Sequence, residues 1–242
     1  MPHAVTPLRH DFAAGCEIAA HLHPEHQLIY ASRGIMTVWT DAGSWVVPPQ
    51  RAVWIPARTP HRVTIHGPVS MRTLYLKSTL VQAVPRCCVI NVSPLLRELV
   101  LHACTFAGLT RRAKAQAHLI DLLVDQLEVM DVVPLQLMYP LDARGARVAK
   151  ILSDDPGDSR PLEVVCQSAG ASKRTIERVF REETHLTLGR WRQQLRLLRS
   201  LHLLAAGEKV SRVAVDLGYS TTSAFISMFR KAFGTTPRQY FP

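Results

Sequence analysis

The chain has little of what a disulfide-bonded or membrane-spanning protein needs. Its 242 residues include five cysteines, an odd number without a Cys-x-x-Cys pair, which argues against a disulfide framework or a cysteine zinc site. Buried thiols are expected instead, at Cys16, Cys87, Cys88, Cys104 and Cys166. No apolar run approaches the ~20 residues that cross a bilayer, and the N-terminus lacks the basic start and apolar stretch of a signal peptide. We therefore expect a cytoplasmic protein.

Acidic residues are also few. The chain has 19 Asp and Glu against 29 Lys and Arg, and a formal charge of +10. There are 12 basic and 9 acidic residues before Asp142, against 17 and 10 from Asp142 onward, so the positive excess is concentrated in the C-terminal part. A basic segment is drawn to polyanions because binding releases condensed counterions. Nucleic acid is the usual polyanion, and an anionic membrane surface is the alternative.

The N-terminal part has the pattern of a β-domain. Its runs of β-branched and aromatic residues are short and lie at 28–30, 35–40, 45–47, 52–55 and 62–65. Turn signals separate them, at Arg33-Gly34, Asp41-Ala42-Gly43, Pro48-Pro49, Pro56 to Pro60 and Gly67-Pro68. Many short strands at close spacing predict an antiparallel sandwich or barrel, which we assign to residues 1–92.

Residues 93–141 change to a helical period. The apolar positions are Leu95, Leu96, Leu99, Val100 and Ala103, followed by Leu119, Leu122, Leu123, Leu127 and Met130. The second stripe has near-heptad steps, so it fits a dimer seam and equally a helix packed on its own barrel. The segment from Val132 to Leu141, with Pro134 and Pro140, suits an interdomain connector. We assign residues 93–141 to a helical dimerisation and linker region.

Residues 142–242 are helical in pattern and contain a first helix-turn-helix. A short helix over 143–152 precedes an apolar face that begins after Pro161 and runs to Gly170. Ser172 is a good N-cap for a helix over 173–183. This second helix is the one that such a unit lays in the major groove. Arg174 and Arg178, one turn apart, are placed to contact guanine edges, and Arg181 to contact phosphate.

A second unit repeats the first. A long helix over 189–206 has Arg190, Arg192, Arg196 and Arg199 on its outer face, and for each of these a solvated surface role is the simpler interpretation. Gly218 then closes another short helix, and Ser220 opens another recognition helix. Phe225, Phe229 and Phe233 recur every four residues and face inward. The opposite face is polar and uncharged, which suits base edges, and consists of Thr222, Ser223, Ile226 and Ser227.

Residues 172–240 resemble the double helix-turn-helix domain of the AraC/XylS family of bacterial transcription regulators. The matching motifs are Ala214-x-x-x-Gly218-Tyr219-Ser220, the Phe225 and Phe229 pair, and Phe233-Gly234-x-Thr236-Pro237-x-x-Tyr240. The resemblance implies DNA contacts by Arg174, Glu177 and Arg178 in the first recognition helix and by Thr222, Ser223, Ile226 and Ser227 in the second. One departure is Thr184-His185-Leu186, where the family usually ends its helix with Gly.

The N-terminal part contains a pattern that resembles a cupin barrel. His21 and His23 are two apart and so project to one face of a strand. By this resemblance His21, His23, Gln27 and His61 occupy the four metal-ligand positions, although Gln27 stands where cupins place Glu, and Arg58 where they commonly place Gly. Gln is a poor transition-metal ligand, but three imidazoles bind zinc or nickel. Three hypotheses stay open: a divalent metal, a metal-free pocket for an effector, and ordinary barrel residues. Tyr30, Trp39 and Trp54 are candidates to line the pocket or to pack in the core.

These features predict an α+β protein of two domains, an antiparallel cupin-like barrel with a helical linker and an all-α double helix-turn-helix domain. The favoured function is a sequence-specific transcription regulator without enzymatic activity, whose barrel senses a small molecule. Its expected partners are double-stranded operator DNA, an effector, a second copy of the chain and RNA polymerase, with no membrane. The alternatives are a cupin metalloenzyme, such as a dioxygenase or isomerase carrying a DNA-binding domain, and a non-specific nucleoid binder. The uncharged second recognition face argues against the latter, because phosphate binding alone would favour Lys and Arg.

Overall fold

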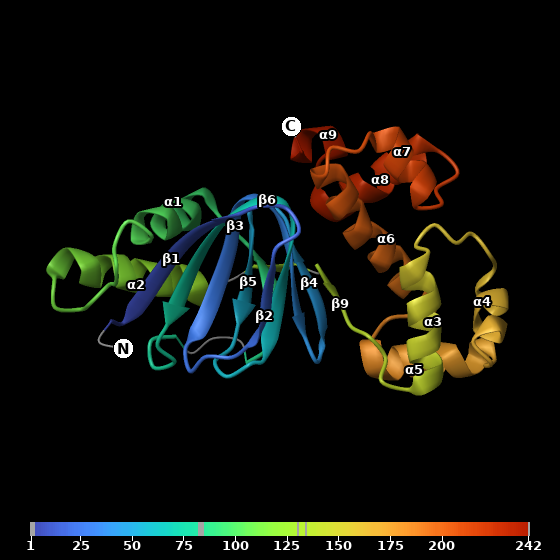
Figure 1. Ribbon diagram of the computed structural model, residues 1–242, viewed down its shortest axis with the longest axis horizontal. Helices are drawn as coiled ribbons and strands as arrows, with labels where there is room; N and C mark the ends of the chain where they lie inside the picture. Colours follow the sequence, from blue (N-terminus) through green and yellow to red (C-terminus); the bar gives the residue numbers. More distant parts are fainter. Residues whose placement is uncertain (1–2, 82–84, 130, 134, 242) are drawn as a thin grey trace. The chain divides into compact units, whose positions relative to one another are not determined.

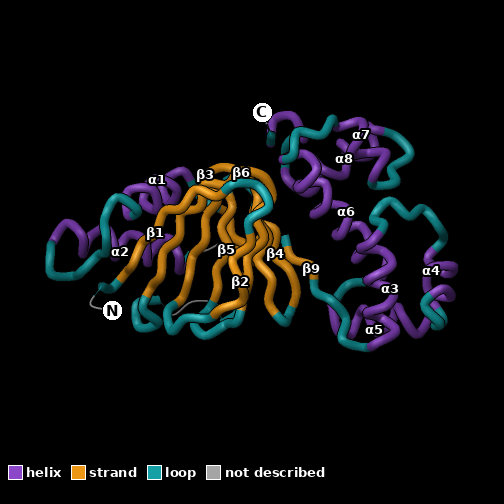
Figure 2. Tube along the Cα trace, in the orientation of Figure 1, coloured by secondary structure: helices purple, strands orange, loops and turns teal. Residues whose placement is uncertain are grey.

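The computed structural model describes residues 3–81, 85–129, 131–133 and 135–241. The chain divides into two compact units, Met1–Gln136 and Leu137–Pro242, of which the first is built on a β-sheet and the second is helical (Figures 1 and 2). Met130 of the predicted stripe and Pro134 of the predicted connector lie outside the described residues. Among the described residues, no helix is long and apolar enough to cross a membrane.

In the described part of the chain there is one nine-stranded sheet, which belongs to the first unit except for the last residue of β9. Its strands are β1 (Val5–Phe12), β2 (Glu17–His21), β3 (His26–Thr40), β4 (Gly43–Val47), β5 (Arg51–Ile55), β6 (His61–Leu76), β7 (Cys88–Asn91), β8 (Val132–Val133) and β9 (Gln136–Leu137). At its centre β6 pairs with β1, β2 and β3, and β3 pairs with β4 and β5, all antiparallel. The antiparallel fold is confirmed, but hydrogen bonding does not close the sheet within the described part of the chain.

The two longest strands pass through positions that the sequence marks as turns. β3 has 15 residues and continues through Arg33-Gly34, where its register to β6 shifts, while β6 has 16 and continues through Gly67-Pro68. The prediction of turns at these two places is wrong. Gly34 and Gly67 have φ of +82° and +76°, a conformation that glycine adopts in a bulge without ending the strand.

Two helices pack on the sheet. They are α1 (Pro94–Ala103), whose N-cap Ser93 accepts a hydrogen bond from the Leu96 amide, and α2 (Lys114–Glu128). Leu119, Leu123 and Leu127 of α2 are buried in one cluster with Leu28 and Leu74 of the sheet. The structure therefore uses this stripe as the packing surface of α2 on its own sheet.

The second unit consists of seven helices within the described residues. They are α3 (Ala143–Asp154), α4 (Leu162–Ser168), α5 (Lys173–Thr184), α6 (Leu188–Ala205), α7 (Val210–Asp216), α8 (Thr222–Phe233) and α9 (Pro237–Tyr240). Ser172 caps α5 as predicted, by accepting a hydrogen bond from the Thr175 amide at 3.2 Å. The second recognition helix begins slightly later than predicted, because Thr221 rather than Ser220 caps α8.

Aromatic side chains form the centre of each half of this unit. Trp191 of α6 is fully buried, with its ring 5.4 Å from that of Phe180 between centroids. In the other half, Phe225 and Phe229 are fully buried and face inward as predicted. Phe233 is half-buried, and its ring packs with those of Phe229 and Tyr240. α5 ends at His185, which takes the left-handed conformation at φ +59° where the family usually has Gly. A non-glycine residue adopts this geometry at a cost of about 1–2 kcal/mol.

Candidate functional site

The helical unit contains two helix-turn-helix motifs of equal dimensions. α4 and α7 each have seven residues, and α5 and α8 each have 12. In both motifs the turn contains a glycine in the left-handed conformation, Gly170 at φ +73° and Gly218 at φ +69°. The second helix of such a motif is the one that enters the major groove, so α5 and α8 are the candidate recognition helices.

The outer face of α5 is basic. Arg174, Arg178 and Arg181 are exposed and line a shallow hollow, together with Glu177 and Glu182. Glu177 also has a role within the protein, because its Oε2 accepts a hydrogen bond from the Leu188 amide at the start of α6, at 3.3 Å. The three arginines are thus presented together, whereas Glu177 is held against the protein.

The outer face of α8 is only partly the one predicted. Ser223 and Ser227 are exposed, whereas Thr222 and Ile226 are half-buried and line a groove with residues of α6, α7 and α9. Sequence reasoning missed Arg230 and Lys231, which are exposed in the last turn. Helical spacing could have identified Arg230, because Ser223, Ser227 and Arg230 are spaced i, i+4 and i+7 and therefore share a face.

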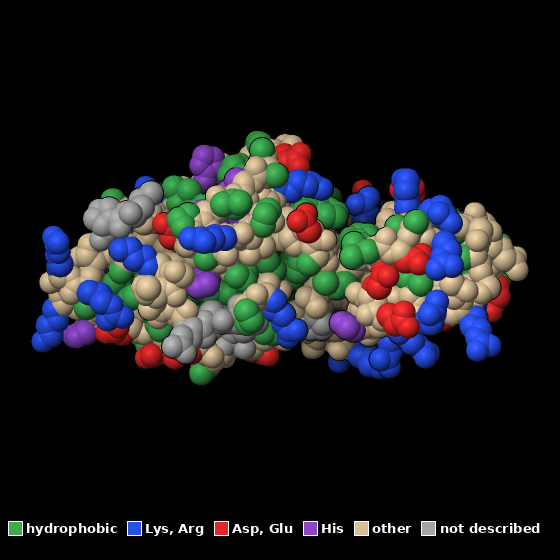
Figure 3. Space-filling model, turned by 90° about the horizontal axis from the view of Figure 1, so that it is seen from below, with side chains coloured by type: hydrophobic (Ala, Val, Ile, Leu, Met, Phe, Trp, Pro, Cys, Tyr) green, Lys and Arg blue, Asp and Glu red, His purple; other side chains and the backbone are tan. Residues whose placement is uncertain are grey.

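The arginines of α6 are not all on a solvated face. Arg190 and Arg199 are exposed, but Arg192 and Arg196 are half-buried and donate hydrogen bonds to backbone carbonyls of the loop between α3 and α4. The prediction of an outward position is wrong for these two. Lys and Arg side chains nevertheless stand out over the surface of the helical unit, interspersed with carboxylates (Figure 3).

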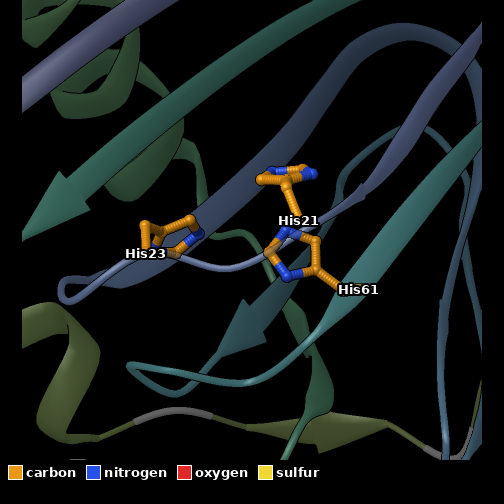
Figure 4. A group of neighbouring side chains, drawn as sticks. All are labelled: His21, His23 and His61. Atoms are coloured by element: carbon orange, nitrogen blue, oxygen red, sulfur yellow. The ribbon is translucent and has the colours of Figure 1, made fainter.

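Three histidines meet in the sheet unit. His21 ends β2, His23 follows it, and His61 begins β6 directly opposite His21 in the strand pairing. Their ligand nitrogens all lie within 4.8 Å of one another (Figure 4). The backbone amide of Arg58 donates a hydrogen bond to the His23 carbonyl at 2.8 Å, which ties the segment after β2 to the loop before β6. Arg58 does so at φ +60°, in the left-handed conformation that favours the glycine commonly found in cupins.

Backbone carbonyls set the tautomer of all three imidazoles. Each ring donates its Nδ1–H to a carbonyl oxygen, and a neutral imidazole then keeps its lone pair on Nε2. The acceptors for His21, His23 and His61 are Ala19, Glu25 and Thr59, each at 2.8 Å. Nε2 of His61 is buried without a hydrogen-bond partner among the described residues. An imidazole whose Nδ1–H is anchored to a carbonyl presents Nε2 as the ligand atom, as is typical of histidines that ligate metals.

Gln27 adds a fourth donor atom. It is buried, and its Oε1 lies 2.9 Å from Nε2 of His23. The orientation of its amide follows from Thr73, whose hydroxyl donates its only proton to the Leu28 carbonyl at 2.9 Å and so accepts from Nε2 of Gln27 at 3.0 Å. Two lone pairs, on Gln27 Oε1 and on His23 Nε2, therefore face each other. A proton or a metal cation between such atoms relieves their repulsion.

Burial keeps His61 uncharged. Loss of solvation lowers the pKa of His61 to about 4, and the neighbouring His21 and His23 act in the same direction. His61 is only 2% exposed. It is therefore neutral at pH 7 and in the protonation state that a metal requires.

Comparisons with known proteins match parts of both units. Residues 165–242 match the family model of a helix-turn-helix domain, and residues 8–76 match that of a cupin domain. Over 223 residues the chain is 34% identical to the HTH-type transcriptional regulator NimR of Escherichia coli strain K12, covering 91% of this chain and 81% of NimR. The chain belongs to the AraC/XylS family of transcription regulators. Its relatives are named as regulators, which favours DNA-binding regulation over the metalloenzyme alternative.

Two further matches of this AraC/XylS-family regulator differ in extent. It is 38% identical to the regulatory protein SoxS of Salmonella typhimurium over 80 residues, which are 33% of this chain and 75% of SoxS. A solved structure of ToxT from Vibrio cholerae covers 98% of this chain and 94% of its own, with a TM-score of 0.41 and 11% identity.

The structure does not bring the three predicted aromatic residues of this regulator to the histidine cluster. Tyr30 and Trp54 belong to the hydrophobic cluster under α1 and α2, on the opposite face of the sheet from Gln27. Trp39 is also on the opposite face from His61, because its indole Nε1–H donates to Thr64 at 3.1 Å. These assignments to the pocket are corrected: the side chains face the wrong side of their strands.

Two other residues take their place beside the cluster. The ring of Tyr75 lies 4.9 Å from that of His23, edge to face, and Thr73 orients Gln27. Both residues lie on β6, and counting in steps of two from His61 leads to both. Strand periodicity in the sequence therefore places Thr73 and Tyr75 on the same face as His61.

Proposed function

We propose that this chain is a one-component regulator in which the sheet unit binds an effector at the histidine cluster and the helical unit binds operator DNA through α5 and α8. The observation that carries the proposal is the meeting of three histidines whose ligand nitrogens lie within 4.8 Å of one another, each ring anchored through Nδ1 to a carbonyl, with the buried Oε1 of Gln27 beside Nε2 of His23. Such an arrangement suits an electron-pair acceptor. A divalent transition-metal ion is the acceptor that imidazole nitrogens prefer.

In this proposal His21, His23 and His61 hold the metal, and Gln27 contributes a neutral oxygen. A bound divalent cation would supply an electrophilic anchor for oxygen or nitrogen donors of an effector. Tyr75, which packs on His23, adds an aromatic wall, and Thr73 keeps the Gln27 amide in place. Because Gln27 is uncharged, the site keeps more net positive charge than one with Glu, which favours an anionic effector.

Metal binding predicts a thermal shift. Metal-free protein given Zn²⁺ or Ni²⁺ at about a hundredfold excess over its Kd should gain roughly 2.7 kcal/mol, or about 5–10 °C in the Tm of the sheet unit. His61→Gln should abolish this gain, because it removes the most buried ligand. Differential scanning fluorimetry of each variant with and without metal measures it.

The matched control is His118→Gln, which changes an exposed histidine of α2. It should retain the full metal-dependent shift. An equal shift in wild type and His61→Gln, or none in wild type at millimolar metal, would refute the metal assignment and leave the effector pocket as the metal-free alternative.

DNA recognition by α5 predicts a base-specific role for Arg178. Arg178→Ala should weaken operator binding by about 1–3 kcal/mol and relax the preference at one base pair, because a bidentate guanine contact is lost. Arg181→Ala should weaken binding to all sequences alike, as loss of a phosphate contact does. Binding constants on an operator selected from a random DNA library, and on its single-base variants, measure both effects.

The control for charge is Arg112→Ala, an exposed arginine of the sheet unit. It removes the same charge and should leave the base preference unchanged. Unaltered affinity and preference in Arg178→Ala would contradict the assignment of α5 as a recognition helix.

Effector control requires that the ligand bind two arrangements of the protein with different affinity.

The proposal includes a homodimer. It is supported by two apolar side chains that remain exposed on the helices of the sheet unit, Leu95 of α1 at 48% and Leu122 of α2 at 38%. The proposal also includes contact with RNA polymerase when the operator lies next to a promoter, and action in the cytoplasm, where that DNA is.

A further inference from the structure

The two helix-turn-helix motifs are joined by more than the helix that connects them. Arg196 lies near the middle of α6, and its side chain turns toward the loop between α3 and α4. Its Nε donates to the Pro156 carbonyl at 2.8 Å, and its Nη2 donates to the Asp158 carbonyl at 2.9 Å. A guanidinium presents donors in a rigid planar fork, so these two bonds fix the orientation of the side chain as well as its position.

The same guanidinium also contacts the second motif. Its central carbon lies 5.8 Å from the ring centroid of Tyr219, in the turn between α7 and α8. Tyr219 in turn packs on Phe225, with ring centroids 5.5 Å apart. Arg196 therefore contacts the loop that precedes α4 and the turn that precedes α8. A half-buried cation held by two carbonyls and an aromatic face is well compensated for the solvation that it loses.

Beside Arg196 the two motifs touch through their backbones. A Cβ atom added at Gly218 would lie 2.4 Å from the Gly157 carbonyl oxygen and 2.9 Å from Nη2 of Arg196. A Cβ added at Gly157 would lie 2.5 Å from the Asp216 carbonyl oxygen. Only two glycines allow the loop and the turn to approach so closely. We call Arg196, Gly157, Gly218 and Tyr219 the brace.

We propose that the brace sets the separation of α5 and α8, and that Arg196 is a positioning residue which restricts the protein to operators with one spacing between their two elements. This rests on the proposed recognition of DNA by α5 and α8. One added base pair moves the second element by 3.4 Å and turns it by about 34° around the duplex, since ~10.5 base pairs make a turn. A rigid pair of recognition helices cannot follow that displacement, whereas a loosened pair can.

The test compares full-length wild type with Arg196→Lys, which keeps the charge and loses the planar fork. The DNA is an operator selected by wild type from a random library, used with its own spacing and with one base pair inserted or removed between the elements. Wild type should bind the altered spacings at least about tenfold more weakly, the cost of losing one good base contact. Arg196→Lys should reduce this ratio to about threefold or less.

Arg199→Lys is the control, because it makes the same change at an exposed position of the same helix. It should keep the wild-type ratio. Tyr219→Leu, which removes only the aromatic side of the brace, should lower the ratio as Arg196→Lys does and provides the measurement if Arg196→Lys does not fold.

The ratio separates positioning from general stability. A variant that is merely less stable loses affinity for every spacing in parallel and keeps the wild-type ratio, and that result in both Arg196→Lys and Tyr219→Leu would overturn the proposal. Wild type that discriminates sequence but not spacing would overturn it as well. Failure of wild type to enrich any sequence would instead refute the proposed DNA recognition, and the two failures are therefore distinguishable.

Discussion

Replacing Trp191 by alanine is expected to destabilise the helical unit by about 3–5 kcal/mol, the range for truncating a buried Trp or Phe. Trp191 is fully buried and contacts the rings of Phe180 and Tyr139. Its indole Nε1–H also donates to the Met138 carbonyl at 2.7 Å, so truncation both opens a cavity and leaves that carbonyl without this donor. Specific DNA binding should fall with the folded fraction, because α5 is packed against this core through Phe180.

Urea unfolding of the full-length protein, followed by far-UV circular dichroism, measures the effect. The control is Trp191→Phe, which keeps most of the ring and loses the hydrogen bond, and it should cost about 1–2 kcal/mol. In both Trp191 variants the three remaining tryptophans lie in the sheet unit, so the fluorescence transition reports on that unit alone and should be the same in the two variants. A helical transition unchanged in Trp191→Ala would contradict the packing described for α6.

Gly34→Ala is expected to destabilise the sheet unit by about 2–5 kcal/mol. The new Cβ would lie 2.2 Å from the Pro68 carbonyl oxygen and 2.8 Å from Cγ2 of Val69. A left-handed φ costs an alanine about 1–2 kcal/mol, and forcing a backbone carbonyl aside adds a further 1–3 kcal/mol. Because Gln27 lies on β3 and His61 on β6, displacing the two strands at Gly34 should also weaken the metal binding proposed for the histidine cluster.

Gly67→Ala is a closely matched control. Gly67 has nearly the same conformation, φ +76°, and an added Cβ there meets nothing within 4 Å. It should show the conformational cost alone, about 1–2 kcal/mol. Chemical denaturation followed by tryptophan fluorescence compares the two, and equal losses would mean that the Gly34 contact with Pro68 contributes nothing.

Periodicity predicted most of the fold. The change from period two to period 3.6 at residue 93 separates the strands up to β7 from α1 and α2, and apolar spacing located α5, α6 and α8 to within a few residues. It failed at Arg33-Gly34 and Gly67-Pro68, since the same glycine conformation serves a turn and a bulge. Which applies depends on the opposite strand, because β3 and β6 bend together there, and that pairing is not local information.

The candidate sites were predictable to different degrees. His21, His23, Gln27 and His61 follow from spacing and from the cupin resemblance. The position of Trp39 could not be predicted from spacing, because register shifts between residues 31 and 35 decide which face of β3 it occupies. Tyr30 could have been excluded, since it lies three residues from Gln27 and so on the opposite face of a strand.

Arg196 shows the limit of sequence patterns for charged residues. Spacing along α6 places it with arginines expected on a solvated face, yet it is half-buried between two motifs. Its hydrogen-bond acceptors are the backbone carbonyls of Pro156 and Asp158. Every residue has such a carbonyl, so the residue types at these positions do not predict the contact.

In the proposed mode of DNA recognition, the unlike outer faces of α5 and α8 give a single chain a direction on DNA. α5 presents three exposed arginines, whereas α8 presents Ser223 and Ser227 before its basic last turn. A site with two dissimilar elements cannot be bound equally well after a half-turn rotation, so one protein molecule docks in one sense only. Inverting the operator beside a promoter would then reverse which end of the protein faces the transcription start, with the affinity unchanged. The polarity of the site, and not its occupancy alone, becomes a determinant of the transcriptional outcome.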